Sequence, residues 1–217
     1  VTADPQSKIY GAANPTLTFQ YSGFQGTDNA TDLTTEPTAS TTVTLTTEVG
    51  IHDDAITVSG GVDENYNFTY YAADFTVNKA TLTVTADPKT KVYGEDNPAL
   101  TFQYSGWVNG VEAIDSPPVA GTWVDNSSGV GTWIGAITVS GGSDNNYTFT
   151  YVAGDFTVTQ AVLTVTADPK SKVYGEDNPE LTFQYSGWVN GVEAIDTPPV
   201  AGTWVDNSSG VGTWIGA

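Results

Sequence analysis

Apolar and polar residues alternate with a period of two over much of the chain, as in β-strands that bury one face. In the segment from Phe75 to Ala86, Phe75 and Val77 form one apolar set, and every second residue from Ala80 onwards forms another. The two sets are out of phase by one residue, and such a shift turns the inward face of a strand to its other side. We therefore expect the last strand of one domain to run directly into the first strand of the next.

The same pattern recurs from Phe156 to Ala167, which predicts a second junction of this kind. Neither segment contains a run of residues typical of a flexible linker. The sequence therefore predicts a rod of domains joined end to end.

A repeated motif, VTADP, begins at Val1, Val84 and Val165 and defines the domains. We assign residues 1–83 to a divergent first repeat, residues 84–164 to a second, and residues 165–217 to a third that lacks the segment matching residues 137–164. Two explanations of the truncated third repeat stay open. Either the chain is a fragment of a longer array, or a neighbouring chain supplies the missing strands.

The second repeat predicts about seven strands separated by turns rich in Gly, Pro and Asn. After the end of the shared strand at Val84–Ala86, the expected strands are Lys91–Tyr93, Leu100–Tyr104, Val119–Val124, Trp133–Ser140, Tyr147–Tyr151 and Phe156–Val158. Trp107–Ile114, which contains an Asn-Gly turn signal, predicts a hairpin or a short ribbon. The fold class is all-β, and the turn spacing favours an antiparallel, immunoglobulin-like β-sandwich in each repeat.

The chain is strongly acidic, with a net charge of −19 and six lysines as its only strong bases. Such a charge argues against binding to nucleic acid or to anionic membrane surfaces. No segment approaches the length of a membrane-spanning helix, so no membrane insertion of this segment is expected. The absence of Cys excludes thiol catalysis and thiolate zinc sites. The acidity suits a solvated surface, repulsion between neighbouring rods, or divalent cations.

The titratable residues do not favour catalysis. His52, the single histidine, aligns with Trp133 and Trp214 in the other repeats, whereas a repeated catalytic site would keep its base. The neighbouring carboxylates of Glu95 and Asp96 lie in a turn, without the apolar surroundings that raise the pKa of a catalytic acid. We predict that the protein is not an enzyme.

Calcium is the one ion for which the sequence offers ligands, because hard cations are bound by carboxylate and amide oxygens of loops. The candidate ligands are Asp87, Glu95, Asp96 and Asp144. Asp87 directly follows the shared strand, so an ion there would stiffen the junction. Asp and Asn are also the ordinary residues of turns, and no EF-hand spacing exists. Both interpretations stay open, and no other cofactor is expected.

The tryptophans of the second repeat recur in the third. If these tryptophans are exposed, their rings could stack on sugar rings, and repeated sites would give avidity along an array. If they are buried, they fill the core or the junctions between repeats. The recurring pairs are Trp107 and Trp188, Trp123 and Trp204, and Trp133 and Trp214. Trp107 follows a Ser-Gly turn, so we take Trp107 and Trp188 as the candidate ligand-binding residues.

Several motifs of the repeat together resemble the MBG domain of the YGX type. They are KVYGEDNPALTFQYSG (Lys91–Gly106), ITVSGG (Ile137–Gly142), NYTFTY (Asn146–Tyr151) and FTVTQAVLTV (Phe156–Val165). The resemblance covers all three repeats and implies tandem β modules of large bacterial cell-surface and adhesin-like proteins. It implies an extracellular array at the cell surface, and it supplies no catalytic residues.

We therefore expect a structural role as a stalk or filament of a bacterial surface adhesin, whose partners are neighbouring repeats of the same or an identical chain. Two alternatives stay open. The chain could be a self-assembling filament subunit completed by strands from a neighbouring chain, or a module that binds a surface glycan of a host or substratum through exposed tryptophans.

Overall fold

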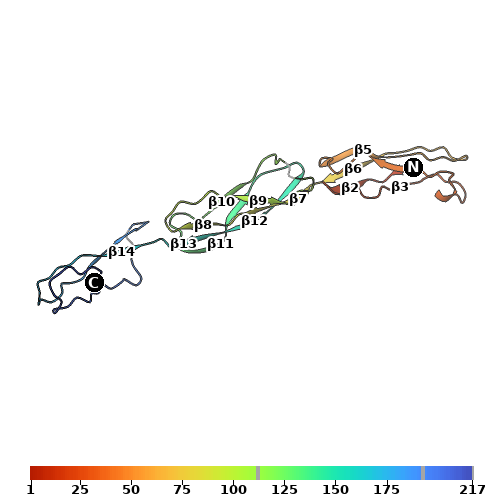
Figure 1. Cartoon of the computed structure of the whole chain (residues 1–217). Helices are drawn as coiled ribbons and strands as arrows, with labels where there is room; N and C mark the ends of the chain where they lie inside the picture. The colour runs from red at the N-terminus through yellow and green to blue at the C-terminus, as the bar shows by residue number, and fades with distance from the viewer. Residues whose placement is uncertain (111–112, 192–193, 217) are drawn as a thin grey trace. The chain divides into compact units, whose positions relative to one another are not determined.

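The computed structural model describes residues 1–110, 113–191 and 194–216 (Figure 1). Over these residues the regular structure is β-strand, apart from one short 3-10 helix, η1 (Ala30–Asp32). The chain divides into two compact units. The first contains Val1–Asp87, Leu100–Gly121 and Ile137–Gly154, and the second contains Pro88–Ala99, Thr122–Ala136 and Asp155–Ala217. The division runs through the second repeat, so each junction between repeats lies inside one unit. The predicted domain limits themselves stay predictions.

Among the described residues, three sheets lie wholly within the first unit. The four-stranded sheet has the order β2 (Gln6–Ile9), β6 (Ala73–Asn78), β5 (Gly50–Ser59), β4 (Thr38–Thr41). Beside it, β1 (Thr2–Ala3) pairs with β3 (Phe19–Gln20). The first strand of the second repeat, β7 (Ala80–Ala86), lies between β12 (Tyr147–Val152) and β9 (Phe102–Ser105).

The remaining strands repeat this plan. A second four-stranded sheet has the order β10 (Val119–Thr122), β11 (Gly131–Ser140), β13 (Gly154–Thr159), β8 (Lys89–Val92). In the third repeat, β14 (Thr164–Ala167) pairs with β15 (Phe183–Ser186) in the register that β7 has with β9. The strands confirm that the chain is all-β. The predicted hairpin at Trp107–Ile114 lies partly outside the described residues, and Trp107–Gly110 contains no strand.

The expectation of antiparallel sheets is met only in part. Among the strand pairs that the described residues form, β2 with β6, β8 with β13, and β7 with β12 are parallel. The physical reason is the path of the chain through a repeat. When a chain enters a repeat at one end and leaves it at the other, its early and late strands run in the same direction. Where such strands become neighbours, they pair in parallel.

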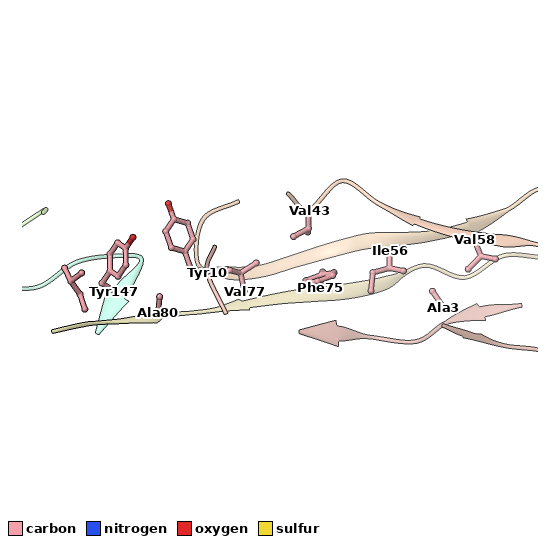
Figure 2. Packing of buried hydrophobic residues seen from close by; sticks show 10 residues of the cluster. Ala3, Tyr10, Val43, Ile56, Val58, Phe75, Val77, Ala80 and Tyr147 are labelled. Atoms are coloured by element: carbon pink, nitrogen blue, oxygen red, sulfur yellow. The ribbon is translucent and has the colours of Figure 1, made fainter. Parts of the chain in front are cut away.

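The predicted junction between the first two repeats is confirmed as an almost uninterrupted strand, whereas the same prediction for the next junction is wrong, because β13 ends at Thr159 and β14 begins only at Thr164. β6 ends at Asn78 and β7 begins at Ala80, so only Lys79 separates them. Phe75 and Val77 are buried before Lys79, and after it the buried residues change phase by one, beginning at Ala80. Figure 2 shows these side chains along the strand, beside Tyr10 and Tyr147. The core is therefore continuous along this strand from the first repeat into the second.

Candidate functional site

Asp144 and Asp87, two of the candidate calcium ligands, accept hydrogen bonds that shape turns. Asp144 is buried, and its Oδ1 accepts from the backbone N–H groups of Asn146 and Tyr147 at 2.8 and 3.0 Å. The Oδ2 atom of Asp87 accepts from the Oγ1 of Thr101 and from the Nε2 of Gln103. Both carboxylates therefore act as hydrogen-bond acceptors, Asp144 in a turn and Asp87 at the end of a strand.

The other two candidates lie in the turn after β8. The Oε2 atom of Glu95 accepts from the backbone N–H of Val92 at 3.4 Å, and the Oδ1 atom of Asp96 accepts from the Nδ2 of Asn126 at 2.8 Å. Within the described ranges, no three His, Asp or Glu residues are grouped in a way that could hold a metal ion. The structure therefore does not gather these candidates into one site, and calcium binding stays a prediction.

The loop after β10 is held by the carboxylate of Asp125. Its Oδ1 accepts from the backbone N–H and the hydroxyl of Ser127 and from the hydroxyl of Ser128, at distances of 2.9, 2.8 and 3.1 Å. The hydrogen bonds from Ser127, followed by that from Ser128, lower the pKa of Asp125 below its ordinary value. Asp206 makes the same contacts in the third repeat, and its pKa is lowered for the same reason. In both repeats this carboxylate fixes the loop through hydrogen bonds to the two serines.

A lysine and an asparagine also hold this loop, through its backbone carbonyls. Both lie in Lys91–Asn97, the segment that contains the Tyr-Gly motif Tyr93-Gly94. The ammonium of Lys91 donates to the carbonyl of Asp125 at 2.6 Å, and the Nδ2 of Asn97 donates to the carbonyl of Val124 at 2.5 Å. Lys91 is only 5 % exposed, and its Nζ lies 5.9 Å from the centre of the Phe156 ring. A buried ammonium is tolerated here because carbonyl oxygens and an aromatic face replace its water.

The same lysine and asparagine contacts recur in the other repeats. Lys8 and Asn14 donate to the carbonyls of Thr44 and Val43 in the first repeat. In the third, Lys172 and Asn178 donate to the carbonyls of Asp206 and Val205. Sequence reasoning missed this role. The available signal was a lysine and an asparagine six residues apart in every repeat, in a chain with six lysines in all.

The structure places Trp107 and Trp188 in half-buried aromatic clusters. The ring centre of Trp107 lies 5.5 Å from that of Tyr104 and 5.4 Å from that of Tyr147. Trp188 packs 5.7 Å from Tyr185. Trp107 follows a Ser-Gly turn, but Tyr147, forty residues later in the chain, packs against it, so it is less exposed than Trp123. Ligand binding by these two residues stays an untested prediction.

The exposed indoles belong to the other tryptophans. Trp123 is 59 % exposed and packs edge to face against Trp133, with 5.2 Å between ring centres. Trp204 is 60 % exposed and packs in the same way against Trp214, at 5.0 Å. Trp123 directly follows β10 and Trp133 lies on the neighbouring strand β11, a proximity that the sequence pattern did not reveal.

Repeated side chains that hold turns, loops and strand ends define the class of this molecule, an all-β tandem-repeat protein. The chain belongs to the MBG domain (YGX type) family, whose model matches residues 1–76, 82–157 and 163–215. The resemblance inferred from the motifs is therefore confirmed in all three repeats. No curated protein and no solved structure matches the chain. None of the helical residues that the structure describes forms a helix long and apolar enough to cross a membrane.

Proposed function

We propose that this chain is part of an extracellular stalk or filament of a bacterial surface adhesin, built from immunoglobulin-like β-sandwich modules joined end to end in a rod. The observation that carries the proposal is the junction at Lys79. A single residue separates β6 from β7, and the residues on either side of it are buried or paired. Such a junction leaves no flexible linker about which neighbouring modules could bend.

Further contacts stiffen this junction. The Nζ of Lys79 donates to the carbonyl of Asp144 at 2.6 Å, and the backbone N–H of Ala80 donates to the carbonyl of Asn146 at 3.0 Å. The side-chain oxygen of Asn146 in turn accepts from the N–H of Val49 in the first repeat, at 3.1 Å. The net charge of −19 would keep such stalks apart and in solution.

The solution shape of the chain tests this proposal. Small-angle scattering combined with light scattering should give an extended monomer whose maximum dimension is the same in calcium and in a chelator. A matched variant with six Gly and Ser residues inserted after Lys79 should give a broader distribution of shorter dimensions. A wild-type chain as compact or as variable as this insertion variant would contradict the stalk. A dimension that grows only with calcium would instead identify the carboxylates as ligands.

A second candidate function, glycan binding, is favoured by the pairs Trp123–Trp133 and Trp204–Trp214, in which Trp123 and Trp204 are exposed. In an edge-to-face pair one indole keeps a face free, and an exposed indole face is a surface on which sugar rings stack. The pairs recur 81 residues apart, so two weak sites would act together on a polysaccharide.

Binding to a panel of immobilised oligosaccharides measures this function. We expect Trp123→Ala combined with Trp204→Ala to weaken binding by roughly a hundredfold, because both stacking faces and their avidity are lost. The single change Trp123→Ala should lose the avidity alone. If the wild type binds no member of the panel, or if the double variant binds as well as the wild type, this function is wrong.

A further inference from the structure

The turn of the Tyr-Gly motif in the first repeat contacts a bend of the second. Gly11 has a φ of +75°, and a Cβ atom placed on it would lie 2.4 Å from Cγ2 and 2.5 Å from Cβ of Val108. The next residue, Asn109, donates from Nδ2 to the carbonyl of Leu45 at 3.5 Å. That carbonyl also accepts from the N–H of Gly11 at 3.2 Å. The glycine and the carbonyl thus form one receiving surface, which we call the socket, and Val108–Asn109 is the plug.

The junction between the second and third repeats has the same arrangement. Gly94 has a φ of +84°, and a Cβ atom there would lie 2.6 Å from both Cβ and Cγ2 of Val189. The Nδ2 of Asn190 donates to the carbonyl of Asn126 at 3.0 Å. Leu45 and Asn126 differ in side chain, but the plug contacts their backbone carbonyls. The contact is therefore insensitive to the sequence divergence of the first repeat.

Aromatic packing fixes the plug of the first junction within its own repeat. Trp107 packs against Tyr147, and the hydroxyl of Tyr147 accepts from the N–H of Val108 at 3.4 Å. Tyr147 also meets Tyr10 of the first repeat edge to face, with 5.7 Å between ring centres. The half-buried Trp107 thus anchors a bend whose next two residues reach the preceding repeat.

We propose that the Tyr-Gly turn is a binding site whose partner is the Trp-Val-Asn bend of a further repeat of the same kind. The glycine serves two needs, since it adopts a positive φ and leaves the space that the valine occupies. The third repeat has the corresponding turn at Tyr174-Gly175, and the described residues place no plug against it. Among the described atoms none lies within 4 Å of a Cβ placed on Gly175, and Tyr174 is 65 % exposed, against 5 % for Tyr10.

Repeats with the plug sequence are the partners that fit this surface. The second and third repeats carry it as Trp107-Val108-Asn109 and Trp188-Val189-Asn190, whereas the first repeat has Phe24-Gln25-Gly26 at the corresponding positions. The first repeat therefore offers a socket but no plug. This inference does not rest on the extracellular function, since it concerns recognition between repeats wherever the chain is located.

Gly94→Ala and Gly175→Ala in the full chain form a matched pair for the test. Both glycines have a φ of +84° and lie in the same Lys-Val-Tyr-Gly-Glu-Asp-Asn sequence, so alanine is equally strained at each. Of these two glycines, only Gly94 lies against a valine side chain, that of Val189. We expect Gly94→Ala to accelerate amide hydrogen exchange at Trp188–Asn190 roughly ten- to a hundredfold, the effect of overpacking, and Gly175→Ala to leave it unchanged.

Two further variants separate a lost plug from a misfolded turn. Asn190→Ala strains neither turn, and its lost hydrogen bond should accelerate the same exchange roughly two- to tenfold. In a Val189→Gly background, Gly94→Ala should add no more than Gly175→Ala does. Equal effects of Gly94→Ala and Gly175→Ala, or unchanged exchange in Asn190→Ala, would overturn the proposal and leave the glycine with its turn conformation alone.

Discussion

Replacing Leu82 with alanine should lower the free energy of unfolding by about 2–5 kcal/mol, whereas the same change at Leu163 should cost much less. Both leucines occupy the same place in the sequence Leu-Thr-Val-Thr-Ala-Asp-Pro. Leu82 is fully buried on β7, which pairs with β12 on one edge and β9 on the other. Leu163 is only half-buried, and among the described strands β14 pairs with β15 alone. The cavity left by the Leu82 side chain would therefore be enclosed by protein and closed to solvent.

Urea denaturation followed by tryptophan fluorescence and circular dichroism measures this difference. Because the repeats differ in burial, separate transitions are expected, and the free energy is assigned to the transition that each variant moves. Val84 and Val165 supply a second matched pair, being 0 % and 43 % exposed. Equal losses at Leu82 and Leu163 would mean that the third repeat is packed as well as the second, contrary to the greater exposure of Leu163 and Val165.

The features that sequence reasoning predicted correctly are those that local alternation determines. The phase of buried residues around Lys79 follows from which side chains are apolar, since successive residues of a strand point to opposite faces. The positions of β9, β11 and β12 follow from the same rule. Which strands lie next to each other in a sheet does not follow from this rule. Nothing in the alternation of Tyr147–Val152 indicates that it pairs in parallel with a strand more than sixty residues earlier.

The side chains that sequence reasoning misjudged or overlooked depend on such distant neighbours. Trp107 is covered by Tyr147, and Lys91 is buried because its ammonium meets the carbonyl of Asp125 and the ring of Phe156. A backbone carbonyl has no sequence signature, so no motif could have identified the partner of Lys91. The sequence also could not assign the repeated Asp residues, because a carboxylate that accepts from backbone N–H groups and one that binds calcium occur in the same turn sequences.

Adding a copy of residues 137–164 after Ala217 should complete the third repeat and bury its first strand. In the second repeat the corresponding segment contains β12, which pairs in parallel with β7 from Tyr147↔Ala80 to Val152↔Thr85. It also contains β13, which pairs with β8 beside the buried Lys91. In the extended chain Leu163 and Lys172 should become as buried as Leu82 and Lys91. Leu163→Ala should then cost about 2–5 kcal/mol, as Leu82→Ala does.

Amide hydrogen exchange at Thr164–Ala167 measures the completion directly, because a strand paired on both edges opens only with its whole sheet. A matched control carries the same extension with serine at the positions that copy Tyr147 and Phe156, whose side chains are buried in the second repeat. That control should leave exchange at Thr164–Ala167 as fast as in the unextended chain. Slow exchange with the control extension would show that added length, rather than a specific strand, protects β14.

The same segment supplied as a free peptide distinguishes completion within one chain from completion by another. A covalent extension holds the strand at a high effective concentration, whereas a peptide must overcome the loss of its own freedom on binding. We therefore expect protection of Thr164–Ala167 from the extension and little from the peptide at micromolar concentration. Strong protection by the peptide would instead favour a filament in which neighbouring chains exchange strands, since the open edge of β14 would then bind a separate strand without any linkage.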